Sequence, residues 1–127
     1  MKKLLLLLFL IPNLAVSYGD VKWEVVTYKD GVIASYVEVN SIQKVGKNKR
    51  QFWVYANLPI KNGKKISASS LYEADCVKKT FKELVTTYFN KYDLKGNAIF
   101  NDTKPSPLKH ARPGSHNHNV INFACKN

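Results

Sequence analysis

Cysteine is scarce in this 127-residue chain, which contains only Cys76 and Cys125. The two residues lie too far apart to form a C-x-x-C pair, the spacing that places two thiolates on one zinc ion or makes a redox-active disulfide. The sequence therefore argues against a cysteine-based zinc site and against thiol–disulfide exchange. A structural disulfide is the remaining expectation if the chain reaches an oxidising compartment.

A long apolar run is also missing. The apolar stretch from Leu4 to Ile11 is well short of the roughly 20 residues that cross a bilayer. Lys2 and Lys3 precede this stretch and Ala15-Val16-Ser17 follow it, which is the order of a cleavable secretory signal over residues 1–17. No cysteine lies near the cleavage point, so the sequence offers no site for lipid attachment.

If residues 1–17 are a cleaved signal, residues 18–127 form the exported protein. Their number suits one compact domain and is too small for two. We expect this domain to lie in the periplasm, at the cell surface or outside the cell, with no transmembrane segment after cleavage. In an oxidising compartment Cys76 and Cys125 should pair. Closing that loop of roughly 50 residues should stabilise the domain by about 4 kcal/mol.

Acidic residues are few, 9 against 20 lysines and arginines, and the formal charge is +11. Removing Lys2 and Lys3 from that total leaves +9 on side chains. This charge favours anionic partners such as sulfated glycans, acidic lipid head groups or acidic protein surfaces. A solvated surface without a partner is the alternative. Nucleic acid is not expected, because the chain is predicted to be exported and has no recognisable binding motif.

Four segments favour strands because β-branched and aromatic residues alternate in them between turn residues. They are residues 20–28, 32–39, 51–58 and 66–76, separated by turns at 29–31, 44–50 and 59–65. A short apolar piece follows at 98–100.

Residues 77–92 are ambiguous. Their apolar side chains recur at helical spacing, which favours an amphipathic helix. The cluster of β-branched and aromatic residues at 85–89 favours a strand instead.

The C-terminal part predicts a loop and then a helix. Residues 101–115 contain three prolines and no apolar period, so we expect an irregular crossing loop. Ser115 is placed to cap a helix. One narrow apolar face would follow, formed by Val120, Ile121, Ala124 and Cys125. The predicted fold is an α+β domain, a single twisted antiparallel β-sheet of about five to six strands with a C-terminal α-helix packed on it and one disulfide.

No catalytic constellation stands out. His110, His116 and His118 cluster near the C-terminus, but His116 and His118 would diverge around a helix capped by Ser115, and no carboxylate lies nearby. We therefore expect surface imidazoles, no metal, no cofactor and no enzyme.

Two sets of residues are candidates for binding. Lysines and one arginine fill two predicted turns and could bind an anionic ligand: Lys44, Lys47, Lys49, Arg50, Lys61, Lys64 and Lys65. In a simple meander these turns lie at opposite ends of the sheet, which would separate the two clusters. Trp53 and Tyr55 lie opposite the apolar face of their strand. They are either packed in the core, exposed for contact, or buried in a homodimer.

Several features, taken in order, resemble the bacterial surface-adhesin protein E family. They are Trp23, Tyr36-Val37-Glu38, Ser41-Ile42, Gly46, Phe52-Trp53-Val54, Asp75-Cys76, Pro113-Gly114-Ser115 and Cys125. The sequence departs from the family pattern at Glu38, where an aspartate is usual, and in lacking the lipid-attachment cysteine of some members.

The resemblance implies an antiparallel sheet with a C-terminal helix and a cysteine bridge, and it favours a strand at 77–92. It also implies adhesion, since the member that names the family binds host extracellular-matrix proteins. No binding residue carries over from it. We therefore expect an exported, non-enzymatic binding protein for a host matrix protein or an anionic glycan. The alternatives are an envelope structural or stress protein and a periplasmic enzyme inhibitor.

Overall fold

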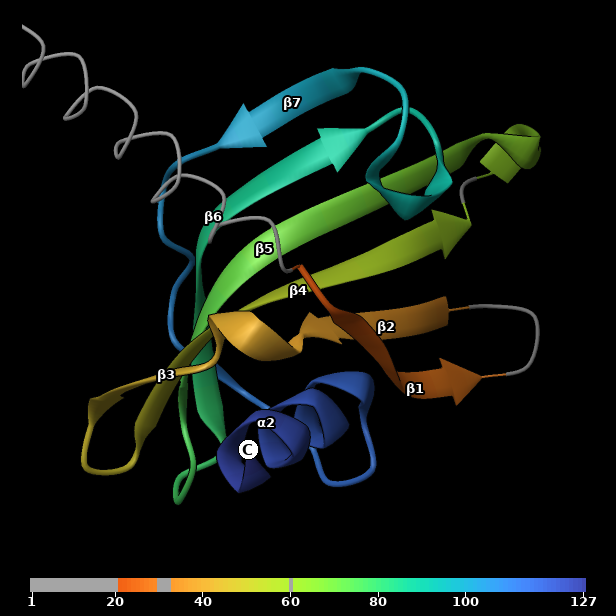
Figure 1. The fold of residues 1–127 in the computed structure, drawn as a ribbon. Helices are drawn as coiled ribbons and strands as arrows, with labels where there is room; N and C mark the ends of the chain where they lie inside the picture. Colours follow the sequence, from red (N-terminus) through yellow and green to blue (C-terminus); the bar gives the residue numbers. More distant parts are fainter. Residues whose placement is uncertain (1–20, 30–32, 60) are drawn as a thin grey trace, which may run out of the picture.

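The computed structural model describes residues 21–29, 33–59 and 61–127, so the predicted signal at 1–17 and most of the turn at 29–31 lie outside the described residues. The described residues form eight strands and a C-terminal α-helix (Figure 1). The strands are β1 (Trp23–Lys29), β2 (Ile33–Glu38), β3 (Gln43–Gly46), β4 (Lys49–Pro59), β5 (Lys65–Asp75), β6 (Thr80–Phe89), β7 (Ala98–Asp102) and β8 (Lys109–His110), and the helix is α2 (His116–Lys126). Short 3-10 turns are η2 (Val39–Ser41), η3 (Lys61–Gly63) and η4 (Tyr92–Leu94).

All strands belong to one antiparallel sheet in the order β1-β2-β4-β5-β6-β7. The short strands β3 and β8 lie off this path: β3 continues beyond β2 along β4, and β8 continues beyond β7 along β6. The predicted fold class is confirmed, with β3 and β8 bringing the strand count above the expected five to six. The predicted turn at 44–50 was too long, because β3 and β4 pair up to Gly46 and Lys49 and leave only residues 47 and 48 to turn.

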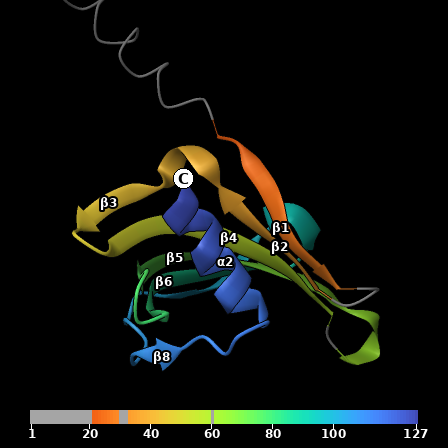
Figure 2. The same cartoon turned by 90° about the horizontal axis from the view of Figure 1, so that it is seen from below.

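The core lies between one face of the sheet and α2 (Figure 2). Alternation along β4 and β5 points Phe52 and Tyr72 to this face, where their rings lie 5.8 Å apart. The helix contributes its predicted apolar residues, of which Val120 and Ile121 are almost completely buried. Ser115 caps the helix as expected, since its hydroxyl accepts from the backbone N–H of His118.

The disulfide joins the turn after β5 to the last turn of α2. Cys76 and Cys125 are bonded, as predicted from the sequence, across a separation of 49 residues. Their Cα atoms lie 5.9 Å apart. The bond therefore fixes the C-terminal half of α2 against one end of the sheet.

The ambiguous segment 77–92 contains a turn and then strand β6, so the strand expectation is confirmed and the helix is wrong. A register shift in the β5–β6 pairing explains the misleading spacing: Tyr72 pairs with Glu83, but Leu71 pairs with Val85, which leaves Leu84 as an extra residue. The bulge reverses the in-out alternation. Because β6 also carries apolar side chains on both faces, their spacing imitates a helical period.

The loop predicted at 101–115 is partly strand. β7 continues to Asp102, and β8 pairs Lys109 and His110 with the start of β6. Between them, Ser106 is fixed to Glu83, because its backbone N–H donates to the Glu83 carbonyl and its hydroxyl accepts from the Glu83 N–H. These hydrogen bonds hold the proline-containing segment alongside β6. The sequence did not predict this, because the segment has no alternating apolar residues.

Removing the disulfide should destabilise the domain. We expect Cys76→Ser combined with Cys125→Ser to lower the free energy of unfolding by about 4 kcal/mol, because the unfolded chain regains the entropy of an open 49-residue loop. Urea unfolding followed by circular dichroism measures this difference. A reductant should lower the free energy of unfolding of the parent protein and leave that of the double variant unchanged. Equal stability of the two proteins in urea without reductant would contradict the prediction.

Candidate functional site

An open groove lies on the helix side of the sheet, beyond the N-terminus of α2. The helix covers the part of the sheet nearest the disulfide, while β4, β5 and β6 extend past His116 (Figure 2). The uncovered part forms a cavity of about 300 Å³. Its lining combines apolar and polar side chains: Ser35, Val54, Tyr55, Ala56, Leu58, Ala68, Ser70, Tyr72, Glu83, Thr86, Tyr88, His116 and Asn117.

Hydrogen bonds hold the polar side chains of this groove in place. The hydroxyls of Ser70 and Thr86 lie 2.7 Å apart, and the Tyr72 hydroxyl donates to Oδ1 of Asn117 at 3.0 Å. Glu83, the acidic residue of the lining, pairs with Lys109 at 3.2 Å. Burial, assisted by the Glu83 charge, raises the pKa of Tyr72 above its ordinary value, so its hydroxyl stays protonated even in alkaline solution. The groove is therefore fixed in shape and close to neutral.

An aromatic cluster occupies the opposite face of the sheet. The ring of Tyr55 stacks on Tyr36 at 4.4 Å and meets Trp23 edge-on at 4.7 Å. Tyr55, a predicted contact residue, is thus buried beneath its neighbours and only 8% exposed, whereas Trp53 is half-buried. Sequence reasoning missed the contribution of Trp23 and Tyr36, because cross-strand register brings these rings together.

The turn η4 closes over the end of this cluster. Tyr55 and Asn57 both donate to Oδ1 of Asp93, at 3.3 and 3.0 Å, and the Asp93 N–H donates back to Asn57 at 2.8 Å. Asp93 and Leu94 hold positive φ angles of 60° and 59°, a conformation that needs such support in residues other than glycine. Burial and the nearby Asp93 carboxylate raise the pKa of Tyr55 above its usual range.

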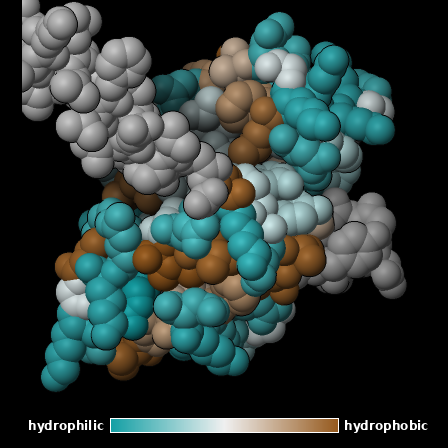
Figure 3. Space-filling view, viewed as in Figure 1, coloured by the Kyte–Doolittle hydropathy of each residue, from teal (hydrophilic) through white to brown (hydrophobic). Residues whose placement is uncertain are grey.

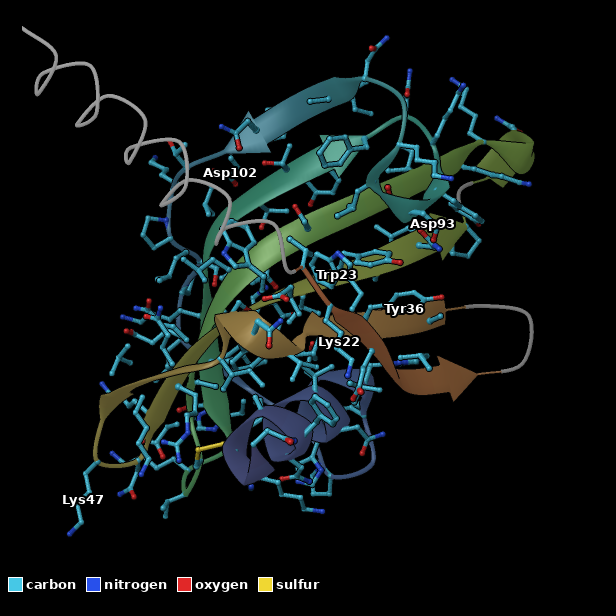
Figure 4. The ribbon with its side chains drawn as sticks, viewed as in Figure 1. Lys22, Trp23, Tyr36, Lys47, Asp93 and Asp102 are labelled. Carbon is cyan, nitrogen blue, oxygen red and sulfur yellow. A yellow bond between two sulfur atoms is a disulfide. The ribbon has the colours of Figure 1, made fainter. Side chains whose placement is uncertain are left out.

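The two groups of basic residues lie at opposite ends of the sheet. Lys44, Lys47, Lys49 and Arg50 belong to the β3–β4 hairpin, and Lys64 and Lys65 to the β4–β5 connection. The β4–β5 register begins at Lys49 and ends at Lys65, so the length of β4 separates them. Figure 4 shows Lys47 at one tip of the molecule and Asp93 toward the other end. Nothing is described for the side chain of Lys61.

Of the three histidines, His116 lines the groove, and His110 and His118 are not among its lining residues. His110 is exposed on β8, whereas His116 and His118 are in the first turn of α2, where His118 Nδ1 lies 3.4 Å from the Asn122 amide. In the part of the chain that the structure describes, no three His, Cys, Asp or Glu side chains gather as a metal site would require. No helix among the described residues has the length and apolar character needed to span a bilayer.

Comparison with known proteins places this arrangement in a family. A family model described as surface-adhesin protein E matches residues 23–126, which include the whole sheet, the groove and the disulfide. No curated protein matches the chain significantly.

The raised pKa values of Tyr55 and Tyr72 predict alkaline destabilisation. Above about pH 10 the tyrosines of the unfolded chain lose protons, while these two stay protonated in the folded state. Their contribution to stability is complete below pH 10 and is lost progressively above it. Urea unfolding between pH 8 and 11 should show this decline, and it should be shallower in a Tyr55→Phe, Tyr72→Phe double variant. An equally steep decline in both proteins would exclude these residues as the cause.

Proposed function

We propose that this chain, which belongs to the surface-adhesin protein E family, is an exported, non-enzymatic adhesin that binds a protein of the host extracellular matrix. One structural observation carries the proposal. α2 covers only part of its sheet face and leaves the groove of about 300 Å³ open on a frame of long paired strands. The family suggests adhesion, and the groove supplies a surface on which a protein ligand could dock.

The composition of the groove supports a protein ligand. Its small side chains, Ala56, Ala68 and Ser70, lie between larger ones, Leu58 and Tyr88. Such a depression accepts one apolar or aromatic side chain of a partner, the kind of anchor that contributes most of the binding energy at protein interfaces. The volume is at the lower limit of typical ligand pockets, which suits a single anchoring side chain better than a large cofactor.

The disulfide supports the exported location. Paired cysteines persist in the periplasm and outside the cell, whereas the cytosol keeps them reduced. The short apolar stretch at residues 4–11 provides the means of export. An adhesin requires both, because its ligand is extracellular.

Filling the groove should abolish binding of the ligand. We expect the purified protein to bind at least one immobilised matrix protein saturably, and Ala68→Trp to weaken that binding by tenfold or more, because the indole occupies the anchor position. Ser69→Trp is the matched control: it adds the same side chain one residue along β5, where alternation directs it to the opposite face. Surface plasmon resonance against a panel of matrix proteins measures both variants.

Two outcomes would contradict this proposal. Absence of saturable binding to every matrix protein tested would remove the adhesin function and favour an envelope structural protein or an enzyme inhibitor. If Ala68→Trp and Ser69→Trp weaken matrix-protein binding equally, the groove is not the binding site. Thermal melts of both variants confirm that the indole has not unfolded the domain.

A further inference from the structure

Three basic segments that are distant in the sequence meet at the disulfide end of the sheet. The β3–β4 hairpin brings Lys44, Lys47, Lys49 and Arg50, the turn between β5 and β6 brings Lys78, and the end of α2 brings Lys126. We propose that this cationic end, defined by these residues, is a binding site for a sulfated glycan chain. The inference goes beyond the proposed function, because it assigns a second site with a different ligand chemistry.

Two bonds through one residue bring the segments together. The Cys76 N–H donates to the carbonyl oxygen of Asn48 at 2.7 Å, which fixes the β5–β6 turn beside the β3–β4 turn. The disulfide from Cys76 to Cys125 then places Lys126 next to both. Figure 4 shows the disulfide on the side of the molecule that carries Lys47, and Figure 3 shows hydrophilic residues forming that tip.

Positive charges lie close together here, and the Asp75 carboxylate offsets only part of the charge of Lys49 and Lys78. Lys44 lies directly across from Arg50 in the β3–β4 ladder, a placement of like charges that disfavours the hairpin. In residues 21–29, 33–59 and 61–127 the ion pairs are Lys22–Glu24 and Lys109–Glu83, and neither includes a residue of the cationic end. An anionic ligand would relieve this repulsion.

The nearby acidic residues serve the fold. Asp75 accepts from the backbone N–H groups of Val77 and Lys78 at 2.9 and 2.8 Å, which closes the β5–β6 turn. The hydrogen bond from Lys78 is the main reason that the pKa of Asp75 is lowered. Glu73 accepts from the Gln51 amide at 3.1 Å. Both carboxylates therefore already have donors.

One part of the cationic end, beside Lys49 and Lys78, is concave. A cavity of about 210 Å³ is lined by Lys49, Lys78 and Lys82, together with Glu73, Ala74, Asp75, Thr80 and Leu108. Lysines arranged around a shallow depression attract several separated negative charges more effectively than a flat surface does.

The distribution of charge favours a linear polyanion over a single phosphate or carboxylate. The cations are spread over three segments, and all but Arg50 are lysines, which act as point charges and lack the planar fork that binds one anion in bidentate fashion. A sulfated glycan presents repeated strong anions along a chain, and it can contact several lysines at once. Its affinity should depend steeply on salt, as for other polyanions that release counterions on binding.

The experiment uses heparin as the probe and two charge-matched variants. The first combines Lys44→Ala, Lys47→Ala and Lys78→Ala at the cationic end. The second combines Lys64→Ala, Lys91→Ala and Lys95→Ala around η3 and η4, at the far end of β4 and β5. Each removes three positive charges, so any difference between them reports position and not net charge.

We expect the parent protein to bind immobilised heparin saturably and less tightly as salt is raised. The first variant should lose about tenfold or more in affinity and show a shallower salt dependence, while the second loses less than about threefold. An equal loss of heparin affinity in both variants would show that binding depends on net charge and not on the cationic end. Absence of saturable heparin binding by the parent protein would also contradict the proposal. If polyglutamate binds as tightly as heparin, the ligand of this site is an acidic protein segment and the proposed sulfated glycan is wrong.

The test is separate from that of the groove. Ala68→Trp should leave heparin binding unchanged, because Ala68 lines the groove at the other end of α2. Loss of heparin binding in that variant would contradict two independent sites. Failure with heparin, combined with groove-dependent binding of a matrix protein, would overturn this inference and leave the proposed function standing.

Discussion

The bond between Cys76 and Cys125 is the constraint on which the rest of the structure depends. It fixes the last turn of α2 to one end of the sheet, and from there the helix lies along the core with Val120, Ile121 and Ala124 buried. A domain of this size has a small core, so a covalent link between its only described α-helix and its sheet matters more than it would in a larger protein. The position of the helix then decides which parts of the sheet stay open.

That position separates two surfaces of different chemistry. At the C-terminus of α2 the disulfide gathers lysines, and Lys126 also lies where the helix dipole favours a positive charge. At the N-terminus the same helix stops above a groove that is close to neutral, in which the hydroxyls of Ser70, Tyr72 and Thr86 are already hydrogen-bonded. Because α2 lies between them, ligands at the two proposed sites would not compete for the same residues. A matrix glycoprotein with sulfated chains would present both ligands together.

The sequence predicts most of the elements, and the exceptions have physical causes. Strand 51–58 and the helix after Ser115 are confirmed because alternation, capping and turn residues agree with each other there. Segment 77–92 was ambiguous because the bulge at Leu84 reverses the alternation within β6, and a bulge has no distinct signal in one sequence. Strand β3 was missed because a polar segment with exposed side chains can still pair through its backbone.

The sites were harder to predict than the elements, for a reason of geometry. The separation of the two basic turns follows from a meander, but the approach of Lys78 and Lys126 to Lys47 depends on pairing across the whole chain. The groove depends on lengths: α2 has 11 residues and spans about 16 Å, whereas β4 and β5 have 11 residues each and span about 36 Å. A helix of this length, fixed at one end of such strands, cannot cover them along their whole length.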